Sequence, residues 1–382
     1  MDSFTPDPVL AALAARPDGA AVLGLRGTRV AVVGGFVRDS LIGRAPREID
    51  LVVEGDPRLL AEQLGGELSV HAAFLACHVA RDGWAIELTR ARRERYVHPG
   101  ALPTVEPATI EQDLVRRDFG VNAIAVTLDD GQLLAPAGAL EDLAARRLRV
   151  LHEQSFIDDP TRVMRLARYR TRLGFAVAPE TAQLAELARL DTVSGARVGA
   201  ELRLILGEPD PLGPLDELAG KLPLAVDREL VAAAQALAPP DADRELLILA
   251  TVARNAPSAW LDALELTARE RAVIDFGARA ASLAAALGAA RSPSELRDVL
   301  RTVPPEAVAI AGALGPTEAA RRWLGDVRHV KLEIGGDDLI AAGVQPGPEL
   351  GARLERTLRR KLDGELEGGR EAELESALGG GP

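Results

Sequence analysis

The segment VAVVGGFVRDSLIGRAPREIDLVVEGD, residues 30–56, decides the fold of this chain. Two apolar runs of β type flank a glycine pair and a short amphipathic stretch, which predicts a strand, a turn, a helix, a turn and a second strand. Gly34 and Gly35 lie where the first strand gives way to the helix, so their backbone N–H groups and the helix dipole suit an anionic triphosphate. A glycine pair alone, however, is more often an ordinary tight turn.

Two carboxylates begin the second strand of this segment. Glu48 and Asp50 are two positions apart at the start of the apolar run Ile49 to Val53, and the period of two in a strand puts both on one face of the sheet. Paired carboxylates on a rigid strand can hold two Mg²⁺ ions about 3.5–4 Å apart, which activate an attacking hydroxyl and stabilise a leaving group. Glu87, in the next clear strand AIEL, is the candidate third ligand. The simpler interpretation of these acids is a solvated strand edge.

The chain separates into a strand-bearing part and a helical part. Strand-like runs bounded by Gly, Asp or Asn occur between residues 28 and 150, and beyond Leu140 they give way to Leu and Ala at helical spacing. The composition, 47% apolar but only 3% aromatic, suits helix packed on helix. A length of 382 residues implies more than one core. We therefore predict an α+β fold, a small mixed sheet with helices followed by an all-helical array.

Charge and cysteine content restrict the kind of protein. The net charge of −12 argues against nucleic-acid binding by the whole surface, so any RNA site must be local. The best candidate runs from Ala144 to Arg172, where eight arginines against three acids give 8 − 3 = +5. The single cysteine, Cys77, excludes a disulfide framework. With neither a signal peptide nor an apolar run of about 18 residues, the chain is predicted to be cytoplasmic and to have no membrane partner.

Four segments carry a family resemblance. They are, in order, the G-G-x-V-R-D turn with its acid-x-D-L-V-V-E-G-D strand, EQDLVRRDFGVNAIAV (111–126), SFIDDPTRVMRLARYRTRLGF (155–175) and IGGDDLIAAGVQPGPELG (334–351). They resemble motif A, the R-R-D-F-T-I-N-A motif, the E/D-D-x-x-R motif and the tail motif of class II tRNA nucleotidyltransferases. This family includes CCA-adding enzymes and bacterial poly(A) polymerases. The ordered matches span nearly the whole chain.

The resemblance implies an order of domains. In this family a DNA polymerase β-like nucleotidyltransferase head is followed by a helical neck, body and tail, which agrees with the change of pattern near Leu140. The expected parts are an N-terminal helical lead-in (1–27), the catalytic head (28–140), a helical neck with nucleotide-base recognition (141–206), a helical body (207–330) and a helical tail that contacts tRNA (331–382).

The resemblance also implies nucleotide-binding residues in the head. In the first motif these are the two glycines and Arg38. In the second, Asp118 and Asn122 are four apart, on one face if the segment is helical, and could hold the ribose hydroxyl groups, while Arg116 or Arg117 neutralises phosphate. Without the resemblance, an Arg-Arg-Asp cluster is usually a surface ion-pair group of little energetic value.

The third motif suggests how a base could be selected without a template. Asp159 could accept from the exocyclic amino group of cytosine or adenine and Arg162 could donate to the neighbouring ring nitrogen, whereas uracil and guanine present the reverse order. Arg165 and Arg168 follow near one helical face with Tyr169 beside them, and could line a groove for the tRNA acceptor stem or the triphosphate. The simpler interpretations are a helix cap at Asp159 and a solvated basic face.

The function that the resemblance implies is template-independent transfer of CMP and/or AMP from CTP and ATP to the 3′ end of tRNA, with release of pyrophosphate. Glu48 and Asp50 would bind two Mg²⁺ ions and Glu87 would assist. The motifs do not separate CCA, CC and A addition from poly(A) synthesis, so a bacterial poly(A) polymerase stays open. Glu48 stands where the family usually has Asp, which also leaves open a catalytically impaired RNA-binding homologue.

Overall fold

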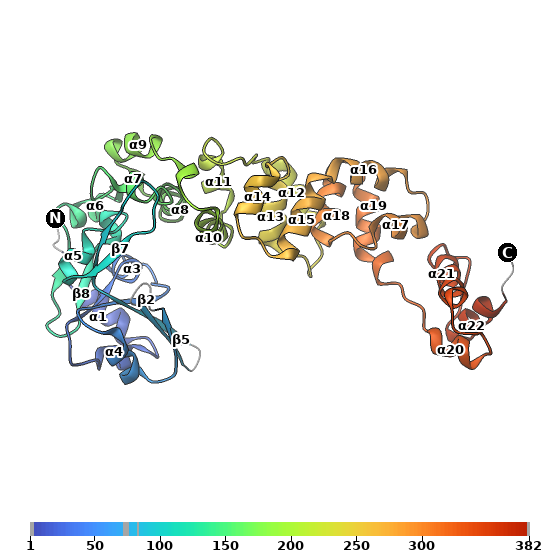
Figure 1. Ribbon diagram of the computed structural model, residues 1–382, viewed down its shortest axis with the longest axis horizontal. Coiled ribbons are helices and arrows are strands. Elements are labelled where there is room, and N and C mark those ends of the chain that lie inside the picture. The colour runs from blue at the N-terminus through green and yellow to red at the C-terminus, as the bar shows by residue number, and fades with distance from the viewer. Residues whose placement is uncertain (1–3, 72–75, 82–83, 380–382) are drawn as a thin grey trace. The chain divides into compact units, whose positions relative to one another are not determined.

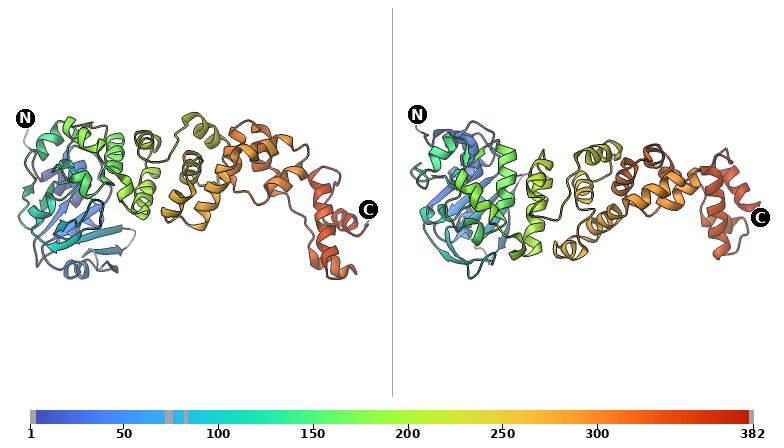
Figure 2. Two further views of the ribbon diagram at one scale, coloured as in Figure 1. Left: turned by 45° about the horizontal axis from the view of Figure 1, so that its top comes forward. Right: turned by 90° about the horizontal axis from the view of Figure 1, so that it is seen from above.

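The computed structural model describes residues 4–71, 76–81 and 84–379. The chain divides into two compact units, Met1–Pro214 and Leu215–Pro382. The first unit holds all the described strands, and the described part of the second consists of helices and their connections (Figure 1). The predicted change from a mixed sheet with helices to an all-helical region is therefore confirmed. Figure 2 shows the same division, with strands among the blue and cyan segments and helices from yellow to red.

Seven strands form one mixed sheet in the first unit. Their spatial order is β3 (Glu67–His71), β4 (Ala76–Arg81), β5 (Trp84–Arg90), β2 (Ile49–Val53), β1 (Val30–Val33), β8 (Ala125–Thr127) and β9 (Leu133–Leu134). All four residues of β1 are buried, as expected of a strand with a neighbour on each side and helices nearby. The apolar run that predicted the first strand therefore forms the centre of the core.

The pairing of β2 with β5 is parallel, whereas the other neighbouring strands are antiparallel. A parallel pair needs a crossover connection, and here α4 (Pro57–Leu64), β3 and β4 supply it. In the resulting register Asp50 lies opposite Glu87. The sheet thus brings together two acids that are far apart in the sequence.

Two short helices of the first unit follow directly from local sequence. α3 (Gly35–Leu41) begins immediately after β1, with Gly34 before its first residue. α5 (Ile110–Leu114) begins with a capping box, in which Thr109 and Gln112 each accept a backbone N–H of the other. This cap fixes the start of α5 and therefore the direction in which Asp113 points.

The other helices of the first unit come before, between and after the strands in sequence. They are α1 (Asp7–Ala14), α2 (Gly19–Leu23), α6 (Ala139–Ala144), α7 (Ser155–Asp158), α8 (Arg162–Leu173), α9 (Pro179–Glu186), α10 (Gly195–Leu206) and α11 (Leu212–Leu218), the last of which ends in the second unit. β6 (Arg92–Arg95) and β7 (Thr104–Pro107) form a separate antiparallel ribbon beside α5.

Two expectations about local structure need correction. Strands do not end near Leu140, because β10 (Arg147–Leu148) and β11 (Ala176–Val177) pair in parallel; each has two residues, too few to leave a hydrophobic pattern. The segment from Asp118 to Asn122 is not an α-helix. Phe119 is extended and bridges to Val150, and only Gly120–Asn122 forms a 3₁₀ turn.

Helices of the second unit gather around α18 (Pro305–Ala313), in which Ala307 to Ala311 are fully buried. Those that pack on α18 are α12 (Arg228–Leu237), α13 (Arg244–Val252), α15 (Ala268–Ala278), α16 (Ala280–Ala289) and α19 (Thr317–Gly325), while α14 (Ser258–Ala263) and α17 (Pro293–Leu300) complete this part. In the described chain no single helix is long and apolar enough to cross a membrane; α15 and α16 together, bent by 67°, pass by length and composition only.

The last three helices form a small cluster of their own. α20 (Gly336–Ala341), α21 (Pro348–Leu362) and α22 (Arg370–Leu378) contribute to one apolar core that contains Ile334, Leu339 and Ala377. Glu373 of α22 is fully buried, where Lys361 and the backbone N–H of Glu333 donate to it.

Candidate active site

One cavity of about 700 Å³ lies in the first unit, between the sheet, the β6–β7 ribbon and the helices α8 and α10. Eleven of the residues predicted from the sequence line it: Gly34, Gly35, Asp50, Glu87, Arg116, Arg117, Asp118, Asn122, Asp159, Arg162 and Arg165. Segments spread over more than a hundred residues of sequence therefore meet at one place. Glu48, Arg38 and Arg168 are absent from its lining in the described part of the chain.

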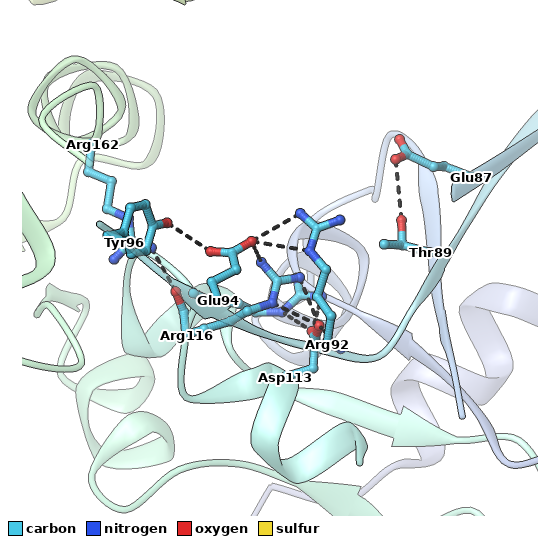
Figure 3. A network of polar contacts seen from close by, with 9 residues as sticks. Glu87, Thr89, Arg92, Glu94, Tyr96, Asp113, Arg116 and Arg162 are labelled. Atoms are coloured by element: carbon cyan, nitrogen blue, oxygen red, sulfur yellow. Dashed lines mark hydrogen bonds and ion pairs between the residues drawn. The ribbon is translucent and has the colours of Figure 1, made fainter. Parts of the chain in front are cut away.

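Asp50 and Glu87 form the acidic part of the cavity, as neighbours on adjacent parallel strands. Burial, and next the charge of Glu87, raise the pKa of Asp50 from 3.8 to about 6. The Glu87 carboxylate is held loosely by the hydroxyl of Thr89, 3.4 Å away (Figure 3). Two adjacent carboxylates, one of them with a raised pKa, are the donors that a divalent cation favours, because the cation removes their mutual repulsion.

The position of Glu48 differs from the prediction that Glu48 and Asp50 share one face at the start of the strand. It precedes β2 and is exposed, and its charge makes a smaller contribution to the raised pKa of Asp50 than that of Glu87. Among the described residues no group of three His, Cys, Asp or Glu side chains is placed to hold a metal ion. Of the carboxylates that line the cavity, Asp50 and Glu87 are the two that lie opposite each other on adjacent strands.

The glycine turn leaves space beside this acidic pair. Gly34 has φ +72° and ψ −131°, a conformation that favours glycine. A Cβ atom built on it would lie 3.5 Å from Nη1 of Arg117 and 4.0 Å from Oδ2 of Asp50. The N–H of Gly34 donates to the carbonyl of Ile124, 3.1 Å away, so this amide is already used within the protein. The contribution of Gly34 is therefore space rather than a hydrogen-bond donor.

We expect Gly34→Ala to lower the stability of the protein by about 1–3 kcal/mol, because a side chain is strained at this φ and ψ. The added methyl group would also enter the cavity, so affinity for the nucleotides that the family resemblance implies, CTP and ATP, should fall about tenfold. Thermal unfolding and nucleotide titration check both effects. Gly35→Ala is the matched control, since a Cβ there meets only Nη2 of Arg38 at 3.6 Å. Equal losses in the two variants would contradict the role given to Gly34.

A buried carboxylate orients the two arginines of the second motif. Asp113 is 0% exposed, and its Oδ1 accepts from Nε and Nη2 of Arg116 at 2.9 and 2.7 Å. Its Oδ2 accepts from Nε and Nη2 of Arg117 at 3.2 and 3.0 Å. Burial alone would raise the pKa of Asp113, but the charges of Arg117 and Arg116 outweigh it and hold the pKa below its usual range. The arginine pair is thus a fixed part of the cavity wall and not a loose surface cluster.

Asp118 and Asn122 come together without a helix. Oδ1 of Asp118 accepts from the Asn122 amide at 3.1 Å, and its Oδ2 accepts from Nε of Arg165 at 2.8 Å. Burial tends to raise the pKa of Asp118, but Arg165 and then Arg162 lower it overall. Arg38 is buried next to Asn122 and donates to the side-chain Oδ1 of Asn122 and to Oδ1 of Asp39.

The carboxylate of Asp159 is partly engaged. Its Oδ1 accepts from the backbone N–H of Thr161 at 3.0 Å and from Nη2 of Arg197 at 2.7 Å. The N-cap residue of α8, Thr161, makes no side-chain cap, but Asp159, which follows α7, accepts the N–H of Thr161 in the turn before α8 in the manner of a helix cap. Arg197 also donates to the carbonyl of Gly100 at 3.0 Å. The described contacts leave Oδ2 of Asp159 available to a ligand in the cavity.

Arg162 is buried and held at both ends of its guanidinium group. Nη1 donates to the Ser155 hydroxyl at 2.6 Å, and Nη2 donates to the carbonyl of Arg116 at 2.7 Å. The same arginine therefore contacts α7 and the segment that carries the arginine pair. Its position in the cavity wall is rigid, as a selective contact requires.

The basic face of α8 is largely buried and paired. The Arg168 guanidinium lies 5.0 Å from the ring centre of Tyr169 and forms ion pairs with Glu201 and Glu208 at 3.5 Å. Arg38, Arg165 and Arg172 also lie over this ring, at 5.4 to 5.7 Å. The prediction of a solvated basic face is therefore wrong for Arg168. The arginine excess of this segment is offset by acids from α10 and its C-terminal end.

Sequence reasoning missed four side chains that organise the cavity: Asp113, Glu94, Tyr96 and Arg197. The i,i+3 and i,i+4 spacing of Asp113 to the two arginines was the only available sign, and on an exposed helix it has little meaning. Glu94 and Arg197 depend on pairings between distant segments, and Tyr96 is organised through Glu94.

Comparisons with known proteins agree with one another. Residues 30–149 match the family model of the poly A polymerase head domain, so the first unit contains a nucleotidyltransferase head. An A-adding tRNA nucleotidyltransferase of Geobacter sulfurreducens is 32% identical over 381 residues, which are 88% of this chain and 43% of the relative. A CC-adding tRNA nucleotidyltransferase of Deinococcus radiodurans is 44% identical over 194 residues, 48% of this chain and 51% of the relative. The chain spans about half the length of these curated relatives, or less.

Solved structures match over a greater length. A Thermotoga maritima CCA-adding enzyme complexed with tRNA has a TM-score of 0.73 and 28% identity, covering 97% of this chain and 98% of that chain. A CCA-adding enzyme in complex with CTP has a TM-score of 0.77 and 27% identity, covering 98% of both chains. Over nearly its whole length this chain is similar to CCA-adding enzymes of the tRNA nucleotidyltransferase family, and its residues 30–149 match the head domain of poly A polymerases. Members of this family generally use divalent metal ions.

Proposed function

We propose that this protein transfers CMP, AMP or both from CTP and ATP to the 3′ end of a tRNA, without a nucleic-acid template and with release of pyrophosphate. The observation that carries the proposal is the meeting in one cavity of an acidic pair, a fixed arginine pair and the Asp159–Arg162 pair. The names of the relatives, which add A or CC to tRNA, support the same substrates.

The acidic pair is suited to Mg²⁺. Asp50 and Glu87 would hold the ions from the sheet, with Glu48 as a further carboxylate that can approach from the start of β2. Because fewer than three protein carboxylates gather there, phosphate oxygens and water would complete the coordination, as is usual for Mg²⁺. When bound, the two ions would lower the pKa of the attacking 3′-hydroxyl and stabilise the leaving pyrophosphate.

The other residues would position the nucleotide. Arg116 and Arg117, held by the buried Asp113, offer fixed positive charge for the triphosphate and need no reorganisation as its charge develops. The Asp118–Asn122 pair, in contact with Arg165, offers polar groups for the ribose hydroxyls.

The Asp159–Arg162 pair would read the base. The free oxygen of Asp159 accepts from the exocyclic amino group that cytosine and adenine share, and Arg162 donates to the adjacent ring nitrogen. Uracil and guanine place a donor and an acceptor in the opposite order and would leave both protein groups unpaired. Such unpaired buried groups cost enough to exclude the wrong base.

Incorporation of labelled CTP and ATP, separately and together, into tRNA that ends at the discriminator base, at C or at CC tests this proposal. We expect Mg²⁺-dependent addition of C, A or both, with a defined product length and no use of UTP or GTP. Adenylate tails of unlimited length would instead indicate a poly(A) polymerase. Binding of tRNA with no incorporation on any end would contradict the catalytic proposal and indicate an RNA-binding homologue.

A further inference from the structure

The aromatic ring of Tyr96 is a part of the cavity wall that the proposed function leaves unused. Tyr96 directly follows β6, is half-buried and lines the cavity together with Asp159 and Arg162. Its hydroxyl donates to Oε2 of Glu94 at 2.8 Å. Figure 3 shows this bond. The hydroxyl is therefore occupied within the protein, and the ring is what remains for a ligand.

A network of ion pairs fixes the ring. Oε1 of Glu94, whose side chain is 6% exposed, accepts from Arg92 at 3.0 Å and from Nη1 of Arg116 at 2.8 Å. Arg116 is in turn held by Asp113, as shown in Figure 3. A branched network of four charged side chains thus holds one aromatic ring, and it connects the ring to the arginine pair of the same cavity. A tyrosine needed only for packing would not require this support.

The connection between β6 and β7, which begins at Tyr96, also brings apolar residues to the cavity wall. Leu102 and Pro103 line the same cavity, and Leu102 is 64% exposed. The connection that carries them is anchored, because the N–H of Gly100 donates to Ile157 at 3.2 Å and its carbonyl accepts from Arg197. Gly100 has φ +72°, and a Cβ there would lie 2.5 Å from the carbonyl oxygen of Thr192. The anchored segment therefore presents apolar surface to the cavity at a fixed place.

A nucleobase needs polar partners at its edge and a flat apolar surface at its face. We propose that Tyr96, completed by Leu102, is the surface on which the base of the incoming nucleotide stacks while Asp159 and Arg162 contact its edge. This inference rests on the proposed function, because it assumes a nucleoside triphosphate in the cavity. Stacking is tolerant of base size, so one ring serves both cytosine and adenine and leaves selection to the edge contacts.

Nucleotide binding without RNA tests the inference, with three probes: CTP, ATP and ribose 5-triphosphate, which has no base. Calorimetric titration of the full chain in Tyr96→Ala should show affinity for CTP and ATP about tenfold weaker, consistent with the usual size of base stacking on an aromatic ring. Affinity for ribose 5-triphosphate should change less than about twofold, since it lacks the stacked group. Tyr96→Phe keeps the ring and should stay within about threefold of the wild type for all probes.

Val97→Ala is the matched control, because Val97 is the next residue, is 72% exposed and does not line the cavity. Tyr96→Leu, which keeps apolar volume, replaces the alanine variant if that variant unfolds. Equal weakening of all three probes would mean that the residue only supports the fold, and unchanged CTP and ATP affinity would mean that the base stacks elsewhere; either result overturns the inference. Selective weakening of CTP and ATP in a protein that adds no nucleotide would support the inference and contradict the proposed function.

Discussion

Nucleotide incorporation should fall on the order of 10³-fold in Asp50→Asn, the largest loss expected of any single substitution in this protein. Asp50 is the more enclosed of the two acids that meet on β2 and β5, and an amide cannot supply the charge that a divalent ion requires. Single-turnover incorporation of CTP or ATP at saturating tRNA and Mg²⁺ measures the effect. Nucleotide titration without metal should be nearly unchanged.

The same substitution should stabilise the metal-free protein at neutral pH. The pKa of Asp50 is raised from 3.8 to about 6, so the folded state binds this proton more tightly than the unfolded state. Stability from this group is therefore present below about pH 4 and lost as pH rises through about 6. At pH 7 the cost of the charged form, at most about 3 kcal/mol, disappears in Asp50→Asn. Denaturant unfolding with a chelator, at pH 4 and at pH 7, measures the difference.

Two companion variants define which carboxylates cooperate with Asp50. Glu87→Gln should approach the loss seen in Asp50→Asn, because Glu87 lies opposite Asp50 in the register. Glu48→Gln should cost only about tenfold, because Glu48 precedes β2 and does not line the cavity, so its charge is less pre-organised than that of Glu87. A loss in Glu48→Gln equal to that of Asp50→Asn would mean that the two acids of β2, and not the cross-strand pair, carry the ions.

Asp113→Asn should lower incorporation about 10²-fold, although Asp113 does not line the cavity. Its two oxygens receive four hydrogen bonds from Arg116 and Arg117, and a neutral amide can neither accept them all nor balance two charges. Removing one partner of a buried ion pair should also cost about 3–5 kcal/mol of stability. Because the pKa of Asp113 is lowered in the fold, this stability is present above the unfolded pKa and is lost in acid.

Glu111→Gln is the matched control on the same helix. Glu111 is 50% exposed and pairs with Arg29 at the surface, so its loss should cost less than about 1 kcal/mol and leave incorporation unchanged. Chemical denaturation measures the loss of protein stability in both variants, and steady-state kinetics measures the effect of losing the orientation of Arg116 and Arg117. If Asp113→Asn lost stability but kept full kcat/KM at low temperature, the arginine pair would not act through Asp113.

The sequence predicted best what depends on short-range pattern. The runs around β1, β2 and β5 are long enough to show their type, and the Leu and Ala spacing of the C-terminal half predicted helices correctly. The fold class is confirmed for these reasons. The helical option for Asp118 to Asn122 failed because the pairing of Phe119 with Val150, a tertiary contact, outweighs local spacing.

The supporting side chains could not be predicted in the same way. Glu94 and Asp113 occur in an arginine-rich stretch that, as a pattern, is indistinguishable from a solvated surface. Their burial comes from the β6–β7 ribbon beside α5. The relation of Asp50 to Glu87 required the parallel register, which no local pattern encodes. The roles of the cavity residues stay predictions until the variants are measured.

The parallel pairing of β2 with β5 also sets how much of the chain must be synthesised before the sheet can fold. Strand β2 is complete at Val53, but its parallel partner β5 ends only at Arg90. Strand β8, which pairs with the other edge of β1, begins at Ala125. Such distant pairings form slowly, whereas the helices of the second unit make mostly local contacts. A ribosome-bound chain can therefore pair β1 with β2 early, but the other edge of each strand must stay unpaired for many residues. This half of the protein should depend most on chaperones, and slower translation before residue 130 should do little to improve its yield.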